Sequence, residues 1–277
     1  MRCVLLILAV FASVAFGQDE ERWFLSSDTS PVDSNKQAAI LKAACEGDVH
    51  GDSCSKCPDS DEGSWTMSSL VLGHFSSARG EEALVGAGSC FYPPAGLGVG
   101  ILVGLRDGKW TKLESVLAFN PDRCTQKKLR SGREFLLCES NEYTRDSQIL
   151  YSLSTVLVEN DEVKFHNLFT AADTTRFCWE GKAQEAKVQK VELGDLNGDG
   201  WEDISITATF GSFQMTERRQ EQCKAAEEDR IQDRKPGKAF PRPAAIKTYK
   251  IELLFDGNRY TATPESRAAI ALFHWDR

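Results

Sequence analysis

Residues Val188–Phe210 read VQKVELGDLNGDGWEDISITATF, and this stretch decides how the rest of the chain is interpreted. Two strand-like runs, Val188–Leu193 and Asp203–Phe210, flank a loop made largely of Gly, Asn and Asp. Apolar residues with a two-residue period are typical of half-buried strands, and Gly, Asn and Asp are typical turn residues. The stretch therefore predicts two adjacent antiparallel strands joined by the loop Asp195–Asp203.

A second hairpin completes this unit further along the chain. Lys247–Phe255 (KTYKIELLF) is followed by the turn Asp256-Gly257 and by Arg259–Ala262. An Asp-Gly pair between strand-like runs favours a tight hairpin, because type I′ turns require positive φ at both central residues. We expect Lys247–Phe255 to pair with Arg259–Ala262.

Two similar units precede this one. The first contains Ser69–Phe75, Glu82–Ala87, Gly100–Leu105 and Trp110–Val116, with the turn Asp107-Gly108; the second contains Glu134–Cys138, Leu150–Val158 and Val163–Phe169, with the turn Asn160-Asp161. A repeat of this length is typical of propeller blades or stacked sheets. The sequence thus predicts an all-β fold over residues 66–277: a propeller-like array of about three four-stranded antiparallel units. The alternative is that any all-β protein yields such hairpin spacing by chance.

Two segments do not fit the strand pattern. Residues 18–65 combine a predicted helix, Asn35–Ala44 with Ser34 as N-cap, and the cysteine-rich loop Cys45–Gly63. The charged insertion 215–243 carries helix formers over Met215–Lys238, and we interpret it as a solvated helix tied down by Cys223. A recognition element is the alternative for the insertion.

The N-terminus predicts export. Residues 1–17 read MRCVLLILAVFASVAFG, with a basic Arg2, an apolar run over 4–16 and small residues before a cleavage site after Gly17. The run is shorter than the roughly 20 residues that span a bilayer. We expect a secretory signal peptide and a secreted protein, extracellular or periplasmic.

The cysteines support the same compartment. Beyond Cys3 there are eight: Cys45, Cys54, Cys57, Cys90, Cys124, Cys138, Cys178 and Cys223. An even number in an exported chain predicts disulfides. Cys54 and Cys57 form a CxxC motif in a polar loop, for which we expect structural disulfides; a redox pair and a zinc site are the alternatives.

The loop Asp195–Asp203 carries the sharpest chemical signal. Its oxygen-bearing side chains are Asp195, Asn197, Asp199 and Asp203, at loop positions 1, 3, 5 and 9, and the carbonyl of Trp201 falls at position 7. Calcium takes six to eight oxygen ligands, which a tight loop supplies from alternate residues, whereas magnesium requires a stricter octahedron. We therefore predict one Ca²⁺ ion here; an ordinary Gly-rich turn is the alternative.

The motif is not an EF-hand, because position 12 of the loop is Ile206 and the flanking runs are strand-like. Val191–Ile204, VELGDLNGDGWEDI, instead resembles the calcium hairpin of FG-GAP/VCBS-type repeats, which occur in integrin-like β-propellers. The resemblance implies the same five ligands. The corresponding loops of the earlier units, Ser76–Gly80 and Arg130–Glu134, lack this set of carboxylates.

Composition and motifs limit which classes of function the chain can have. The formal net charge of −8 argues against nucleic acid or an anionic membrane surface as partner. The sequence contains no HExxH, GxSxG or P-loop motif, and we predict no catalytic residues. We expect a non-enzymatic binding or structural module with a protein or carbohydrate ligand. The alternatives are a secreted hydrolase acting on polysaccharide or peptide through dispersed carboxylates, and a propeller that closes only by oligomerising.

Overall fold

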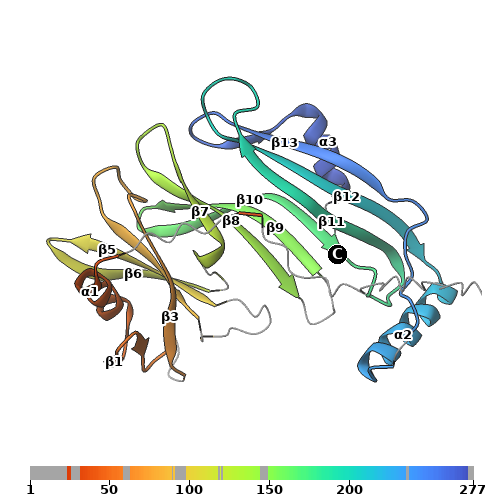
Figure 1. Cartoon of the computed structure of the whole chain (residues 1–277), viewed down its shortest axis with the longest axis horizontal. Helices are drawn as coiled ribbons and strands as arrows, with labels where there is room; N and C mark the ends of the chain where they lie inside the picture. The colour runs from red at the N-terminus through yellow and green to blue at the C-terminus, as the bar shows by residue number, and fades with distance from the viewer. Residues whose placement is uncertain are drawn as a thin grey trace, which may run out of the picture.

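The computed structural model describes residues 24–25, 32–58, 63–88, 90, 98–117, 119, 121–143, 149–234 and 237–273. The predicted signal peptide, residues 1–17, lies outside this range. The described chain is mostly β-strand and forms three antiparallel sheets arranged in succession (Figure 1). The predicted all-β, propeller-like array of about three units, preceded by a disulfide-rich segment with one helix, is confirmed.

Each sheet contains a meander of four strands that follow one another in the chain. The first sheet holds β3 (Trp65–Gly73), β4 (Glu82–Ala87), β5 (Val99–Arg106) and β6 (Lys109–Leu117), with β1 (Val49–His50) and β2 (Ser53–Cys54) added at the β3 edge. The second holds β7 (Cys124–Lys128), β8 (Glu134–Tyr143), β9 (Ile149–Glu159) and β10 (Glu162–Asp173). The third holds β11 (Gly181–Gly194), β12 (Asp203–Met215), β13 (Lys247–Phe255) and β14 (Tyr260–Ala262). A single-turn 3₁₀ helix, η1 (Pro121–Arg123), precedes β7.

The turns explain the pairing of successive strands. Both central residues have positive φ in the β5–β6 turn (Asp107 50°, Gly108 75°) and in the β9–β10 turn (Asn160 55°, Asp161 60°), as type I′ geometry requires. The predicted hairpin of Lys247–Phe255 with Arg259–Ala262 is confirmed, but its turn is wider than a two-residue type I′ turn, because Phe255 pairs with Tyr260. There the Asp256 carboxylate accepts the N–H groups of residues 258 and 259.

The N-terminal helix, α1 (Ser34–Ala44), covers the outer face of the first sheet. Its N-cap is Asp33 and not the predicted Ser34. The side-chain oxygen Asp33 Oδ1 accepts the backbone N–H groups of residues 35 and 36, at 3.0 and 3.1 Å. Ile40 and Leu41 are buried from α1 in a cluster that includes Trp65. The burial of this apolar face stabilises the first sheet on the side away from its neighbour.

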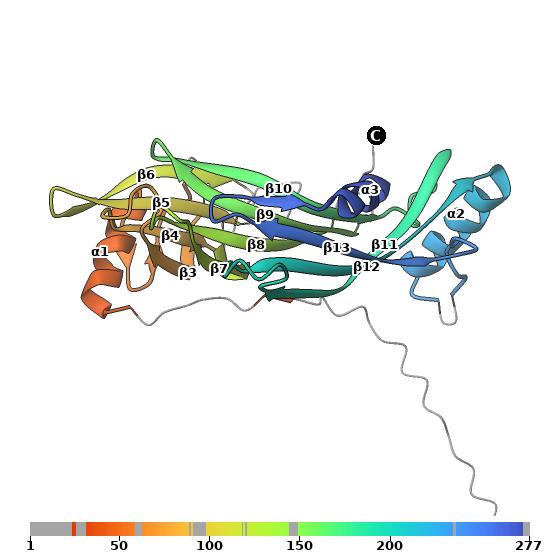
Figure 2. The ribbon, with the colours of Figure 1, turned by 90° about the horizontal axis from the view of Figure 1, so that it is seen from above.

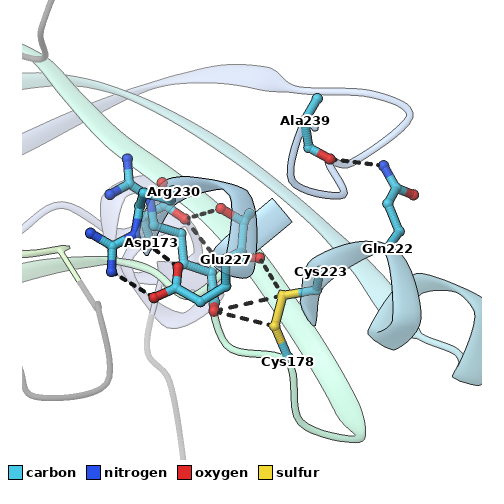
Figure 3. Close-up of a disulfide and its surroundings, with 9 residues drawn as sticks. Asp173, Cys178, Gln222, Cys223, Glu227, Arg230 and Ala239 are labelled. Carbon is cyan, nitrogen blue, oxygen red and sulfur yellow. Dashed lines mark hydrogen bonds and ion pairs between the residues drawn. A yellow bond between two sulfur atoms is a disulfide. The ribbon is translucent and has the colours of Figure 1, made fainter. Parts of the chain in front are cut away.

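The two other helices lie at the far end of the array (Figures 1 and 2). The helix α3 (Pro264–Phe273) packs on β13 and β10, where Phe273 makes edge or tilted ring contacts with Phe169, Phe210 and Tyr249. The predicted helical excursion is α2 (Glu217–Ile231), which projects beyond the third sheet. A disulfide from Cys223 holds α2 to the β10–β11 loop (Figure 3). None of the helices in the described ranges is long and apolar enough to span a membrane.

The sheets are joined by apolar side chains that interleave between them. One cluster, which includes Phe75, Leu102 and Leu136, lies between the first and second sheets. A larger cluster, which includes Leu153, Phe169 and Ile206, lies between the second and third sheets together with α3. The core is therefore a series of inter-sheet layers, as expected of stacked β units.

The outer face of the third sheet ends the array. Along β12, Ile204, Ile206 and Ala208 point into the inter-sheet core, so the alternating residues Ser205 and Thr207 belong to the opposite face. Flanking positions on β11 and β13 carry two ion pairs, Lys190–Glu192 and Lys250–Glu252, each at 2.7 Å. The terminal unit of a repeat array has no neighbour on its outer side, so a polar outer face there keeps the array soluble.

The eight cysteines form four disulfides, as predicted. The pairs are Cys45–Cys54, Cys57–Cys90, Cys124–Cys138 and Cys178–Cys223. Since Cys54 and Cys57 bond to different partners, the redox and zinc interpretations of the CxxC motif are wrong. Disulfides of this number are typical of proteins that fold in an oxidising compartment.

Candidate metal centre

The loop 195–203 is held out at one end of the third sheet by a long hairpin (Figure 1). The strands β11 and β12 pair antiparallel along their length, and their last pair before the loop is Gly194 with Asp203. A bulge between Val188 and Lys190 interrupts the register. The predicted pairing of these strands is confirmed, and β12 is also paired with β13.

Asp195 organises the first half of the loop. Its Oδ1 accepts the N–H groups of Gly198 and Asp199 at 2.7 and 3.2 Å, and its Oδ2 accepts that of Gly200 at 2.9 Å. These bonds, that from Gly200 above all, lower the pKa of the Asp195 carboxyl. Gly198 and Gly200 have φ values of 78° and 86°, in the left-handed region that favours glycine.

Asn197 and Asp199 form the next two turns. Asn197 Oδ1 accepts the Asp199 N–H at 3.0 Å, and Asp199 Oδ1 accepts the Trp201 N–H at 2.9 Å. The Asn197 amide nitrogen also donates to Asp199 Oδ2 at 3.0 Å. Side-chain oxygens of alternate residues are therefore fixed near one another by the backbone of the loop itself.

Asp203 lies apart from this exposed group. It is completely buried, and its oxygens accept the N–H groups of Leu196 at 2.9 Å and Phe255 at 2.7 Å. The residue thus joins the start of the loop to β13. The sequence predicts Asp203 as a calcium ligand, and the structure shows it as a buried acceptor for two backbone N–H groups.

Trp201 attaches the loop to the second sheet. Its ring meets Phe255 edge-on, with centroids 5.8 Å apart, and the Arg130 guanidinium lies 5.7 Å from the ring centroid. Arg130 also donates its backbone N–H to the Gly257 carbonyl at 2.6 Å, and an ion pair joins Lys127 of β7 to the loop residue next to Trp201. The loop is therefore attached to two sheets at once.

The donor set fits calcium in its chemistry. Carboxylate, amide and carbonyl oxygens are its preferred ligands. Asp195 Oδ2 and Asp199 Oδ1 each accept one backbone N–H and so keep a second lone pair, whereas Asp195 Oδ1 accepts two. Within the described ranges, however, no three Asp, Glu, His or Cys side chains lie close enough together to hold a metal ion. The carboxylates of this loop are directed at backbone N–H groups.

Sequence reasoning missed an acidic residue that recurs in every unit. The second strand of each meander begins with an acid: Glu82 in β4, Glu134 in β8 and Asp203 in β12. Glu82 is completely buried like Asp203 and accepts the N–H groups of Phe75 and Ser76 at 2.9 and 3.4 Å. An acid at the first position after each loop is the signal that would have revealed it.

The earlier loops differ from the third in their charge. In the second unit the loop carries the positively charged side chain of Arg133, whose guanidinium donates to the carbonyls of Phe75 and Val158. In the first unit Arg106 lies 3.4 Å from Glu82. Of these loops, only the third combines four acidic residues over nine positions, three of them among the proposed ligands, and the candidate site is confined to it.

A buried acid elsewhere in the fold also escaped the sequence analysis. Glu139 on β8 is 3% exposed, and burial raises the pKa of its carboxyl. A raised carboxyl pKa is a feature of general acids in hydrolases. Glu139, however, is enclosed by the core, and its oxygens accept protein N–H and O–H groups, so it does not support the hydrolase alternative.

Comparison with protein-family models and with curated protein sequences found no match. The class of the protein therefore rests on its own architecture: an all-β, disulfide-bonded array of three antiparallel sheets with one acidic loop.

Proposed function

We propose that the chain is an exported, non-enzymatic binding or structural module of the FG-GAP/VCBS type, with one calcium-stabilised hairpin. Asp195, Asn197, Asp199 and Asp203 would supply side-chain oxygens, and Trp201 its carbonyl. The observation that supports the proposal is that three backbone N–H groups of the loop donate to Asp195, which folds a loop with oxygen-bearing side chains on alternate residues. Bound calcium would supply positive charge that offsets the repulsion among the carboxylates as they turn toward it.

The surroundings of the loop suggest what the ion does. Because Trp201 packs on Phe255 and Arg130, ordering the loop also orders the contact between the second and third sheets. The ion would then stabilise the array. The binding partner of the module, a protein or a carbohydrate, would bind at another surface. A stability role also agrees with the position of the loop at the end of a long hairpin.

Thermal unfolding with calcium and with a chelator tests the proposal. Calcium should stabilise the wild type by RT ln(1 + [Ca]/Kd), about 2.7 kcal/mol at a hundredfold excess over Kd. Asp199→Ala should lose most of this gain. Asp199→Asn is a sharper variant, because its amide oxygen keeps the bond from the Trp201 N–H while the charge is lost.

The matched control is Asp256→Ala. Asp256 also caps a tight turn through two backbone N–H groups, but it lies outside the candidate loop. Its loss should lower the melting temperature and leave the calcium response intact. An equal melting temperature of the wild type in calcium and in chelator would refute the calcium site.

A further inference from the structure

Phe24 and Leu25 contact residues more than a hundred positions away in the sequence. Both backbone N–H groups donate to the same atom, Glu139 Oε1, each at 2.8 Å. The Leu25 side chain is buried in the cluster between the second and third sheets. The Phe24 ring meets the Tyr151 ring edge-on, with centroids 6.0 Å apart and planes at 79°.

Glu139 is an unusual residue for this position. It lies on β8 in an apolar layer, where the hydroxyl of Tyr151 on the neighbouring strand β9 donates to Oε2 at 3.1 Å. Burial there of a carboxylate is unfavourable unless it is hydrogen-bonded, and an apolar side chain would carry no such penalty. Two of the three described bonds that offset this penalty come from Phe24 and Leu25.

The contact has the chemistry of peptide recognition. Successive backbone N–H groups aimed at one anion bind it through the main chain. Here the anion belongs to the sheet and the N–H groups belong to the bound segment. Main-chain bonds supply affinity in such sites, and pockets for the side chains supply specificity. Here Leu25 is buried in the inter-sheet cluster, and Phe24 contacts the ring of Tyr151.

We propose that Glu139 and Tyr151 form a peptide-binding site, which Phe24–Leu25 of the same chain fill as an intramolecular ligand. The ligand class is a peptide segment with two consecutive free N–H groups, an aromatic side chain and then an aliphatic one. The inference rests on the proposed function in one respect, since it names a ligand class for the binding module. It does not depend on calcium.

Occupancy by the chain itself predicts how the site responds to added peptide. A tethered ligand competes at a high effective concentration, so the wild type should bind added peptide weakly. The probe is a fluorescein-labelled peptide of residues 20–29, EERWFLSSDT. The full mature chain with Phe24→Ala and Leu25→Ala should bind this probe at least about tenfold more tightly than the wild type.

Two controls assign that binding to the site. Adding Glu139→Leu to the double variant removes the acceptor and should abolish probe binding. A probe in which proline replaces Leu25 lacks one of the two N–H groups and should bind about tenfold more weakly. Equal binding by the wild type and the double variant, or no binding by a folded double variant, would overturn the proposal.

A second experiment leaves the segment unchanged. Chymotrypsin cleaves after Phe24 only when the segment leaves the sheet, so the cleavage rate reports its release. Glu139→Gln keeps an acceptor but loses the charge, and cleavage should be about tenfold faster. Glu134→Gln is the matched control on the same strand, where the carboxylate accepts the His74 N–H, and it should cleave at the wild-type rate.

The outcomes separate this proposal from the calcium site. If wild-type Phe24 is cleaved as fast as in the free peptide, the peptide site is wrong whatever calcium does. If the double variant binds the peptide as expected and the melting temperature is the same with and without calcium, only the calcium site is wrong.

Discussion

The carboxylate of Asp203 accepts the backbone N–H of Phe255 at 2.7 Å, although 52 positions separate the two residues. Its other oxygen accepts the N–H of Leu196, inside the loop. The last residue of the candidate calcium loop is therefore also the residue that joins the loop to β13. A loss of stability on mutating it cannot by itself be assigned to loss of an ion.

The two roles are separated by comparing Asp203→Ala with Asp199→Ala in chelator. Asp203→Ala leaves two N–H groups without their acceptor beside the buried strand β13, and we expect it to lower the free energy of unfolding by roughly 2–4 kcal/mol. Asp199 is exposed, and without calcium its loss should cost less, about 1 kcal/mol. Chemical denaturation in chelator measures both. Equal losses would show that Asp203 has no separate structural role.

The acid side of the stability profile should depend on Asp195. Its folded-state pKa is lowered, first by the Gly200 N–H, so its contribution to stability is complete above the unfolded-state value of about 3.9 and is lost as the pH falls through the folded-state value. In chelator, the difference in melting temperature between wild type and Asp195→Asn should therefore shrink below about pH 4. A constant difference from pH 7 to pH 3 would contradict this assignment.

Much of the fold could be predicted because strand periodicity and turn chemistry agree. Where they are weak, the prediction fails. The strand β7, CTQKK, was not predicted: it is five residues long, and its first two residues, Cys124 and Thr125, are both buried, so it does not alternate. The helix α3 was also missed, although Thr263 precedes Pro264 and caps the helix through the Ser266 N–H, a start signal present in the sequence.

The candidate site could be predicted in its residues and not in its contacts. Spacing alone places Asp195, Asn197 and Asp199 on one loop. The bond from Phe255 to Asp203 spans 52 positions within the third unit, and the contact of Trp201 with Arg130 joins the third unit to the second. No local sequence pattern encodes contacts between residues so far apart. The contact of Phe24 with Glu139 escaped for the same reason.

The contact between Arg130 and Trp201 should couple the second unit to the third. A guanidinium over an indole at a partly exposed site contributes about 0.5–1 kcal/mol. A double-mutant cycle of Arg130→Ala and Trp201→Ala should yield a coupling free energy of this size, measured by denaturant unfolding. Trp201→Phe keeps an aromatic ring and should keep part of the coupling. Additive losses would mean that the two side chains stabilise their units independently.

The last prediction concerns how α2 is attached, which involves one disulfide and contacts of polar side chains such as Arg219, which lies over the Phe213 ring at 4.9 Å. The disulfide Cys178–Cys223 joins it to the β10–β11 loop, and the Gln222 amide donates to the Ala239 carbonyl at 3.0 Å (Figure 3). Cys223 and Ala226 are its buried apolar residues. Such a short apolar face gives little packing energy, so the disulfide should decide whether the helix stays docked.

Replacing Cys178 and Cys223 by serine should therefore release α2 locally while the sheets keep their structure. Amide hydrogen exchange over 217–231 should become at least about tenfold faster, since a helix this short is marginal when undocked. The global free energy of unfolding should also fall by about 2–4 kcal/mol, because the denatured chain regains loop entropy. The control is removal of Cys124–Cys138, which joins directly paired residues of β7 and β8; it should lower global stability and leave exchange in α2 unchanged. If α2 keeps its protection without Cys178–Cys223, packing and not the disulfide holds the helix.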